Sequence, residues 1–207
     1  MNTIEQKALV LRDRVIDTPR QGRRRLVAII GAPASGKSTL ADVLAQALCS
    51  AGCPAQVVPM DGFHLHNQIL VERELLNKKG APETFDAGGL LHLVKRLHDD
   101  DDVFYPLFDR QRDISIAGAG YVDPTTDTII VEGNYLLLDA PVWRELSQHW
   151  DLTIMLDVPM PELRERLLQR WLSFGLSRDK AIKRAEENDL ANAQIVATQS
   201  LDADFHS

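Results

Sequence analysis

The segment that most constrains the fold is residues 31–38, Gly-Ala-Pro-Ala-Ser-Gly-Lys-Ser, which matches the pattern G-x-x-x-x-G-K-[ST]. A continuous apolar run at residues 26–30 precedes it, and residues 37–51 carry apolar side chains at helical spacing. In a strand, loop and helix of this kind, glycines let backbone N–H groups turn toward phosphate oxygens at the positive end of the helix. The pattern therefore predicts a phosphate-binding loop (P-loop) for a nucleoside triphosphate.

Each residue type in the loop has a predicted task. Lys37 would neutralise the β- and γ-phosphates, and Ser38 would supply a hydroxyl group to magnesium. Thr39 would either contact the α-phosphate or begin the helix. ATP and Mg²⁺ are the cofactors that follow from this interpretation. The predicted nucleotide-binding set is Gly31, Ala32, Pro33, Ala34, Ser35, Gly36, Lys37, Ser38 and Thr39.

The remaining hydrophobic pattern alternates between strands and helices. Apolar runs predict strands at residues 26–30, 55–60, 128–131 and 152–156, which end at Gly31, Asp61, Glu132 and Asp157. Helical spacing of apolar residues predicts helices at residues 86–99, 161–174 and 178–193. Residues 194–198 are predicted to return as a final strand. We expect one P-loop domain over residues 1–207, with α/β/α layers, a mainly parallel sheet and a small helical lid at about residues 160–193.

Composition excludes several other classes of protein. The 207 residues are 44% hydrophobic and carry a formal net charge of −7, which argues against nucleic acid or an anionic membrane as the main partner. Cys49 and Cys53 lack a second pair for a zinc site, so we expect reduced thiols in a cytoplasmic enzyme. The charge runs at residues 23–25 and 99–102 predict solvated turns. Oligomeric state stays open, and a homodimer is one candidate.

Acidic residues at two strand ends are candidates for catalysis. Phosphoryl transfer to an alcohol needs a carboxylate that accepts the hydroxyl proton, and Asp61 followed by Gly62 fits this role, with a turn cap as the alternative. His64 would hydrogen-bond the substrate or lie in solvent. Glu132 would hold magnesium through water or orient the attacking group, unless it only pairs with Lys37.

Four further motifs occur in order along the chain: Met-Asp-Gly-Phe-His at residues 60–64, a Lys-Lys-Gly-Ala-Pro-Glu-Thr-Phe-Asp segment at 78–86, Tyr-Pro-Leu-Phe-Asp-Arg at 105–110 and Val-Glu-Gly-Asn-Tyr at 131–135. Together with the loop, they resemble the pantothenate kinase, uridine kinase and phosphoribulokinase group of P-loop kinases over residues 26–198. Within this group, the motifs at residues 60–64 and 131–135 are most similar to those of bacterial fructose transport system kinases, which implies a sugar acceptor.

The resemblance also implies roles for residues of the lid and the acceptor pocket. Family arginines in the helix at residues 161–174 reach the nucleotide phosphates, which favours Arg166 and Arg170, one helical turn apart. The alternative is a solvated helix face. The segment at residues 105–110 would line the acceptor pocket. The residues themselves add further candidates. Arg110 would bind the acceptor or pair with Asp109, and the Asn192 amide would suit a sugar or lie on the surface. The candidate acceptor-binding residues are Asp61, His64, Tyr105, Phe108, Arg110 and Asn192.

The leading hypothesis is an ATP-dependent kinase whose acceptor is a small hydroxyl compound. Lys37, Asp61, Glu132, Arg166 and Arg170 form the predicted catalytic set. A sugar such as fructose leads, followed by a nucleoside and then pantothenate. A nucleotide-binding regulatory ATPase would leave Asp61 without a task, and a nucleoside monophosphate kinase would require a more basic acceptor pocket.

Overall fold

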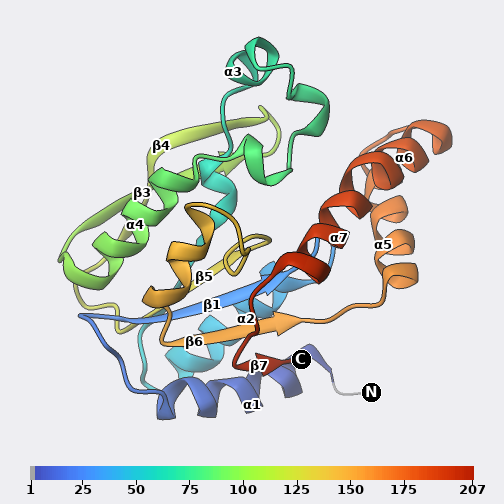
Figure 1. Cartoon of the computed structure of the whole chain (residues 1–207). Helices are drawn as coiled ribbons and strands as arrows, with labels where there is room; N and C mark the ends of the chain where they lie inside the picture. The colour runs from blue at the N-terminus through green and yellow to red at the C-terminus, as the bar shows by residue number, and fades with distance from the viewer. Residues whose placement is uncertain (1–2) are drawn as a thin grey trace.

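A computed structural model describes residues 3–207, and its centre is a five-stranded parallel sheet (Figure 1). The spatial order is β2-β5-β1-β6-β7, so β1 lies between β5 and β6. All four strand pairings in this sheet are parallel, which confirms the predicted sheet type. The strands are β1 (Arg25–Gly31), β2 (Ala55–Pro59), β5 (Thr128–Gly133), β6 (Leu152–Leu156) and β7 (Phe205–His206).

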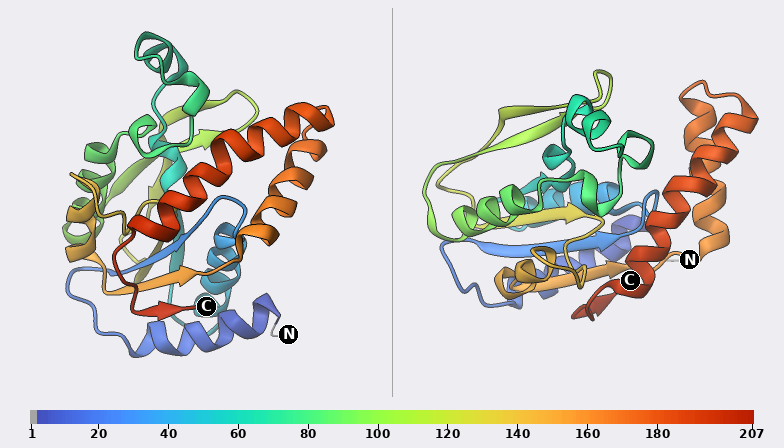
Figure 2. Two further views of the ribbon diagram at one scale, coloured as in Figure 1. Left: turned by 45° about the vertical axis from the view of Figure 1, so that its right-hand side comes forward. Right: turned by 45° about the horizontal axis from the view of Figure 1, so that its top comes forward.

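Two hydrophobic cores cover the two faces of this sheet. Alternate residues of β1 point to opposite faces: Val27 and Ile29 pack with α1 (Ile4–Asp17) and α2 (Lys37–Ser50). Leu26, Ala28 and Ile30 belong to the other core, with α4 (Ala87–Asp99) and the 3₁₀ helix Trp143–His149. Figure 2 shows the same three-layer arrangement from two further directions. The predicted α/β/α layers are confirmed.

A small antiparallel sheet lies beyond the β2 edge of the main sheet and consists of β3 (Val103–Asp109) and β4 (Ile114–Val122). It packs on the 3₁₀ turn Met60–Phe63 that follows β2. A Cβ atom at Gly62 would lie only 2.0 Å from the carbonyl oxygen of Pro106, so only glycine permits this approach. Gly62 therefore brings the segment that carries Asp61 against β3.

Short helical turns complete this side of the molecule. After the Met60–Phe63 turn the chain forms α3 (Asn67–Glu72) and the 3₁₀ turns Leu76–Lys78 and Pro82–Thr84 before α4. His64 forms an isolated antiparallel bridge with Phe85, which returns this excursion to the start of α4. The helix predicted at residues 86–99 is confirmed, with Asp86 as its N-cap.

The segment predicted to form the lid is a helical hairpin that lies on the other side of the P-loop from β3 and β4 (Figures 1 and 2), and we refer to this hairpin as the lid. It runs through α5 (Met160–Ser173), α6 (Arg178–Arg184), the π-helical turn Ala185–Asp189 and α7 (Leu190–Gln199). The strand predicted at residues 194–198 is wrong, because these residues continue α7 and bury Val196 in the core. None of the helices in the described part of the chain is long and apolar enough to cross a membrane.

Candidate functional site

The predicted phosphate-binding loop joins β1 to α2 and is shaped by two glycines. Gly36 caps α2 with φ 95° and ψ 10°, a left-handed conformation that glycine adopts without strain. A Cβ atom at Gly31 would lie 2.5 Å from Ser35 Oγ, so the loop folds tightly onto its own first residue. Lys37, Ser38 and Thr39 form the first turn of α2, where backbone N–H groups have no partner within the helix. This is the geometry of an anion cradle.

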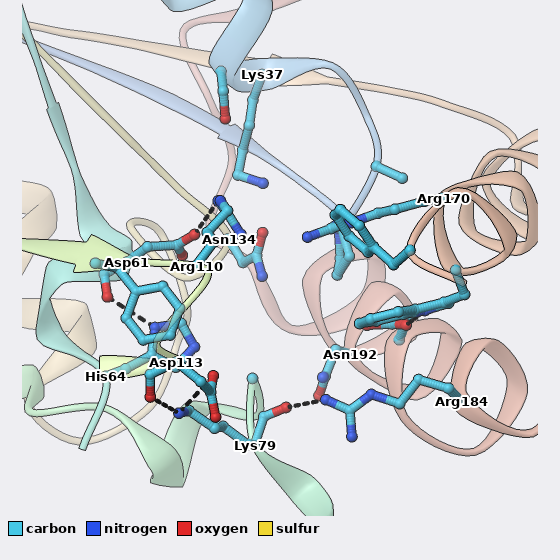
Figure 3. Close-up of a pocket in the computed structure, with 18 of the residues that line it drawn as sticks. Lys37, Asp61, His64, Lys79, Arg110, Asp113, Asn134, Arg170, Arg184 and Asn192 are labelled. Atoms are coloured by element: carbon cyan, nitrogen blue, oxygen red, sulfur yellow. Dashed lines mark hydrogen bonds and ion pairs between the residues drawn. The ribbon is translucent and has the colours of Figure 1, made fainter. Parts of the chain in front are cut away.

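The loop opens onto a cavity of about 470 Å³ between the sheet edge, the β3–β4 hairpin and the lid (Figure 3). Many residues predicted for the site therefore meet in one place. The sequence-predicted residues that line the cavity are Pro33, Ala34, Gly36, Lys37, Ser38, Thr39, Asp61, His64, Phe108, Arg110, Arg170 and Asn192. Gly31, Ala32 and Ser35 are buried behind this lining.

Asp61 lies at the wall of the cavity with its carboxylate engaged by a cation. Arg110, from the turn after β3, donates a hydrogen bond to Asp61 Oδ2 at 2.7 Å. Burial on its own raises the pKa of Asp61, but the nearby His64 ring and the charges of Arg110 and Lys37 outweigh it and lower the pKa. Burial also lowers the pKa of His64, so this ring is neutral at neutral pH. Arg110 and Lys37 are then the cations that hold Asp61 ionised.

His64 is positioned by its own turn and by two aromatic rings. Its Nδ1 atom lies 2.8 Å from the backbone carbonyl oxygen of Asp61, which can only accept, so Nδ1 carries the proton. The ring centroid lies 4.1 Å from that of Phe85 and 4.6 Å from that of Phe108. The neutral ring therefore keeps Nε2 as a hydrogen-bond acceptor beside the cavity.

Glu132 lies behind the loop rather than on the cavity surface. It belongs to the fully buried strand β5 and pairs with Ile29 of β1 and Pro59 of β2 in the sheet register. Burial raises its pKa, and Lys37 lowers it. Its Oε2 atom is buried without a hydrogen-bond partner in the described structure, and the nearby Ser38 hydroxyl lowers the pKa of the carboxylate. An unpartnered oxygen beside a serine hydroxyl suits Mg²⁺, which prefers a few oxygen ligands and keeps waters.

Sequence reasoning missed the lysine at the opposite wall of the cavity. Lys79 is buried, and its ammonium group contacts Asn67 Oδ1 at 2.6 Å and a carboxylate oxygen of Asp113 at 2.9 Å. The same nitrogen lies 5.1 Å from the centroid of the Phe108 ring. The motif at residues 78–86 contains both Lys78 and Lys79, and its sequence carries no signal for which of the two side chains turns inward.

The two arginines predicted in the lid occupy different places. Arg170 lines the cavity, whereas Arg166 donates to the carbonyl oxygens of Ala34 and Ser35 and pairs with Glu162. Arg166 therefore braces the back of the loop. The cavity residues outside the predicted site set are Lys79, Gly80, Phe85, Asp113, Asn134, Trp171, Phe174, Arg184 and Asp189.

Tyr105 does not lie in the cavity, which corrects the prediction that it binds the acceptor. Its side chain is buried, and its hydroxyl accepts a hydrogen bond from Gln56 Nε2 at 3.0 Å. Side chains alternate along a strand, so Tyr105 and Phe108, which lie three positions apart in β3, point to opposite faces. Phe108 faces it, and Tyr105 faces the β2 edge instead.

The arginine run at the amino end of β1 is also not a solvated turn. Arg24 is fully buried and donates to the carbonyl oxygens of Leu97, Asp100, Asp101 and Asp123. Since these acceptors come from distant segments, the sequence pattern contained no sign of them.

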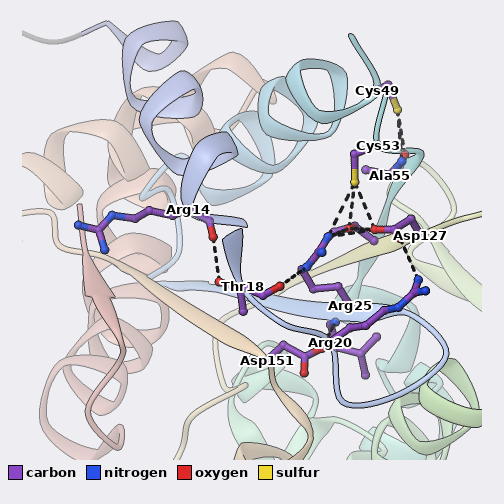
Figure 4. Close-up of polar contacts among 11 residues, drawn as sticks. Arg14, Thr18, Arg20, Arg25, Cys49, Cys53, Ala55, Asp127 and Asp151 are labelled. Carbon is purple, nitrogen blue, oxygen red and sulfur yellow. Dashed lines mark hydrogen bonds and ion pairs between the residues drawn. The ribbon is translucent and has the colours of Figure 1, made fainter. Parts of the chain in front are cut away.

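The same end of the sheet holds both cysteines as free thiols (Figure 4). Arg25 pairs with Asp127 at 2.9 Å and lies within 3.8 Å of Cys53 Sγ. Burial raises the pKa of the Cys53 thiol, which disfavours the reactive thiolate. This cluster lies at the amino ends of β1 and β5, away from the predicted phosphate-binding loop.

The comparisons with known proteins agree with this geometry. Residues 26–181 match the sequence profile of the phosphoribulokinase / uridine kinase family. The chain belongs to this family. It is a P-loop kinase, and its activity is transfer of a phosphoryl group to an alcohol.

Relatives cover almost the whole chain. A crystal structure from Silicibacter sp. TM1040, described as a candidate fructose transport system kinase, is 52% identical, with a TM-score of 0.92 over all of both chains. The Escherichia coli K12 protein YggC is 37% identical over 92% of this chain and 80% of its own length. A candidate uridine kinase of Schizosaccharomyces pombe is 32% identical over 94% of this chain and 87% of its own. The kinase resemblance in the sequence is therefore confirmed.

Proposed function

We propose that this kinase transfers the γ-phosphoryl group of MgATP to a hydroxyl group of a neutral, sugar-like acceptor, such as fructose or a related carbohydrate. The observation that carries the proposal is the position of the ionised Asp61 carboxylate, which lines the same cavity as Lys37 (Figure 3). A carboxylate there can accept the proton of an acceptor hydroxyl while the lysine neutralises the phosphates.

The donor half rests on the loop and the residues behind it. Lys37 and the N-terminal amides of α2 would bind the β- and γ-phosphates, while Arg170, which lines the cavity, would face these phosphates from the lid. Ser38 and Glu132 would hold Mg²⁺, with phosphate oxygens and water as its remaining ligands. When bound, the ion would neutralise charge on the transferred group. No cluster of three acidic, histidine or cysteine residues able to hold a metal occurs within residues 3–207.

The acceptor half has the features of a carbohydrate site. The rings of His64, Phe85 and Phe108 form an apolar wall, and Asp113, Lys79 and Asn192 offer charged and amide groups for hydroxyls. Hydroxyl groups both donate and accept hydrogen bonds, so they suit such a mixed set. The name of the Silicibacter protein, which refers to fructose transport, also supports a sugar.

Charge balance favours a neutral acceptor over a carboxylate such as pantothenate. Five cations line the cavity, namely Lys37, Lys79, Arg110, Arg170 and Arg184. Three carboxylates oppose them, namely Asp61, Asp113 and Asp189. The net negative charge of MgATP balances the small excess of cations, which leaves no surplus cation for an anionic acceptor.

A turnover experiment tests this proposal. ADP release is measured with MgATP and each of fructose, other hexoses and pentoses, uridine and pantothenate, and products are identified by mass spectrometry. We expect a sugar phosphate as the product. Uridine or pantothenate as the only acceptor would replace the sugar assignment. ADP release that responds to no alcohol would contradict the proposed reaction and favour a regulatory ATPase.

Two aspartates at strand ends make a matched pair for the same assay. Asp61→Asn should lower kcat by about 100- to 10,000-fold, because the base is lost. Asp157→Asn should retain activity, because Asp157 is an exposed residue after β6 that pairs with His206. Full activity of Asp61→Asn would remove Asp61 from the mechanism.

A further inference from the structure

The lid carries a cluster around Trp171 that the phosphotransfer mechanism described above does not explain. The guanidinium carbon of Arg170 lies 5.5 Å from the centroid of the Trp171 indole ring, and that of Arg184 lies 5.4 Å from it. Arg170 comes from α5 and Arg184 from α6, and both line the cavity. A cation within about 6 Å of an aromatic centroid is attracted by the ring. The indole is therefore a shared platform for two lid cations.

A buried carboxylate holds this platform. Asp189 is 8% exposed, and its Oδ2 atom accepts a hydrogen bond from Trp171 Nε1 at 2.6 Å. Asp189 is the last residue of the π-helical turn Ala185–Asp189. A π-helical turn holds an extra residue compared with an α-helical turn, and such turns are frequent at functional sites. Here the turn lies between Arg184 and Asn192, two residues of the cavity wall.

The two arginines on the platform differ from their neighbours in the lid. Arg164 pairs with Glu186 at 2.6 Å, and Arg166 pairs with Glu162. Within the described residues, neither Arg170 nor Arg184 forms an ion pair with a carboxylate at hydrogen-bonding distance. Their charges are thus available to a ligand, and the Trp171 ring is the contact that the two arginines share.

The platform also lies at the joint between the lid and the acceptor wall. Arg184 and Asn188 both donate to the backbone carbonyl oxygen of Lys79, at 3.3 Å and 3.0 Å. Figure 3 shows Arg170 and Arg184 on the lid side of the cavity, across from Asp61. A rotation of the Trp171 indole would therefore move both Arg170, which faces the predicted nucleotide side of the cavity, and Arg184, which contacts Lys79 at the acceptor wall.

We propose that Asp189 is a positioning residue that, through its hydrogen bond to Trp171, directs Arg170 and Arg184 into the cavity for phosphoryl transfer. The inference rests on the proposed function, because the cations matter only if a phosphoryl group is transferred there. Pre-oriented cations stabilise a transition state without reorganisation during the reaction. Asp189 itself need not contact either substrate.

Tryptophan fluorescence gives a readout that does not need an acceptor. Trp143 and Trp150 are buried in the core, at 4% and 6% exposure, so a ligand in the cavity should change the emission of Trp171 alone. We expect the non-hydrolysable analogue AMP-PNP with Mg²⁺ to change the emission of the wild type, and the change to be absent from Trp171→Phe. AMP-PNP binding seen by calorimetry without an emission change would contradict the proposal.

Steady-state kinetics separates positioning from a general structural role. Asp189→Ala should lower kcat by about 10- to 100-fold, with the KM for ATP changed by less than about 3-fold, because misdirected charges affect the transition state most. Asp189→Asn keeps an oxygen acceptor and should restore most of the activity. The control Glu187→Gln removes an exposed carboxylate from the same turn and should leave kcat unchanged.

A double-mutant cycle is the decisive experiment. If Asp189 acts through the indole, Trp171→Phe alone should lower kcat as much as Asp189→Ala does, and the double variant should lose no more than either. Additive losses, or a Trp171→Phe variant with wild-type kcat, would overturn the proposal even if Asp189→Ala fails to fold. If no alcohol is phosphorylated, the proposed function fails. The fluorescence experiment needs no acceptor, so it still tests whether a nucleotide in the cavity affects the cluster around Trp171.

Discussion

Arg110 donates a hydrogen bond to the Asp61 carboxylate at 2.7 Å, across 49 positions of sequence. The contact forms because Gly62 lets the backbone at Pro106 approach closely, which brings the turn after β3 over the turn after β2. An ionised carboxylate held by an exposed arginine at the cavity wall is ready to accept a proton. Arg110 is therefore placed to tune the base.

We expect Arg110→Ala to move the acid limb of the pH profile. Arg110 lowers the pKa of Asp61, so its removal raises that pKa. Because the base must be ionised, kcat/KM falls as the pH drops through this pKa, and the variant should lose activity at a higher pH than the wild type. Arg112→Ala is the matched control, since Arg112 pairs with Asp109 on the same turn. An unshifted acid limb in Arg110→Ala would detach Arg110 from the base.

Alanine substitutions at the two left-handed glycines that flank α2 distinguish an effect on the phosphate-binding loop from an effect on stability. Gly36 has φ 95° and Gly52 has φ 81°. Alanine at either position should lower the free energy of unfolding by about 1–2 kcal/mol, because a Cβ atom is strained in this region. Only Gly36→Ala should also weaken ATP binding, measured by calorimetry, because only Gly36 belongs to the loop. Equal ATP affinity in the two variants would contradict the anion-cradle role of the loop.

Glu132→Gln should raise the thermal stability of the protein and weaken its use of Mg²⁺. Burial raises the pKa of Glu132 in the folded state, so its contribution to stability is present below the ordinary pKa of glutamate and is lost as the pH rises through the folded pKa. Without Mg²⁺, the variant should therefore melt at a higher Tm than the wild type at neutral and higher pH, and the difference should vanish at acid pH.

The same variant should require more Mg²⁺ for half-maximal activity, because Gln supplies no negative charge to the ion. Activity titrated with Mg²⁺ at fixed ATP measures this requirement. Glu145→Gln, an exposed glutamate in the 3₁₀ helix Trp143–His149, is a control that should change neither the Tm nor the Mg²⁺ requirement. An unchanged Mg²⁺ requirement in Glu132→Gln would remove Glu132 from the ion site.

Lys79→Met should weaken acceptor binding while sparing the donor. The ammonium group of Lys79 is fixed by Asn67 and Asp113 at the acceptor wall, and methionine preserves much of its length without the charge. We expect the acceptor KM to rise by about 10-fold, as for the loss of one charged hydrogen bond, and the ATP KM to stay constant. Lys78→Met alters an exposed neighbour and should change neither value. A raised ATP KM would place Lys79 on the donor side instead.

Short-range patterns predicted the elements correctly wherever local chemistry decides the structure. The apolar run before Gly31 is typical of a strand buried on both faces, and β1 is such a strand. The glycine–lysine–serine spacing is typical of a loop at a helix N-terminus, where α2 begins. β2 ends two residues before Asp61 and β5 ends one residue after Glu132, so both carboxylates lie at the carboxyl edge of the parallel sheet. The apolar run at residues 194–198 misled the prediction, since Val196 fits a helix packed on the core equally well.

The sequence by itself determined the donor half: the phosphate-binding loop, the sheet that holds it and the carboxylates at its edge. Only the tertiary structure decided the rest, because the remaining positions depend on contacts between distant segments. It turned Lys79 inward and Tyr105 away, buried Arg24 among backbone carbonyls, and gathered Arg170, Arg184 and Asp189 around Trp171. Such contacts balance burial, charge and hydrogen bonding over the whole fold, and no local pattern encodes that balance.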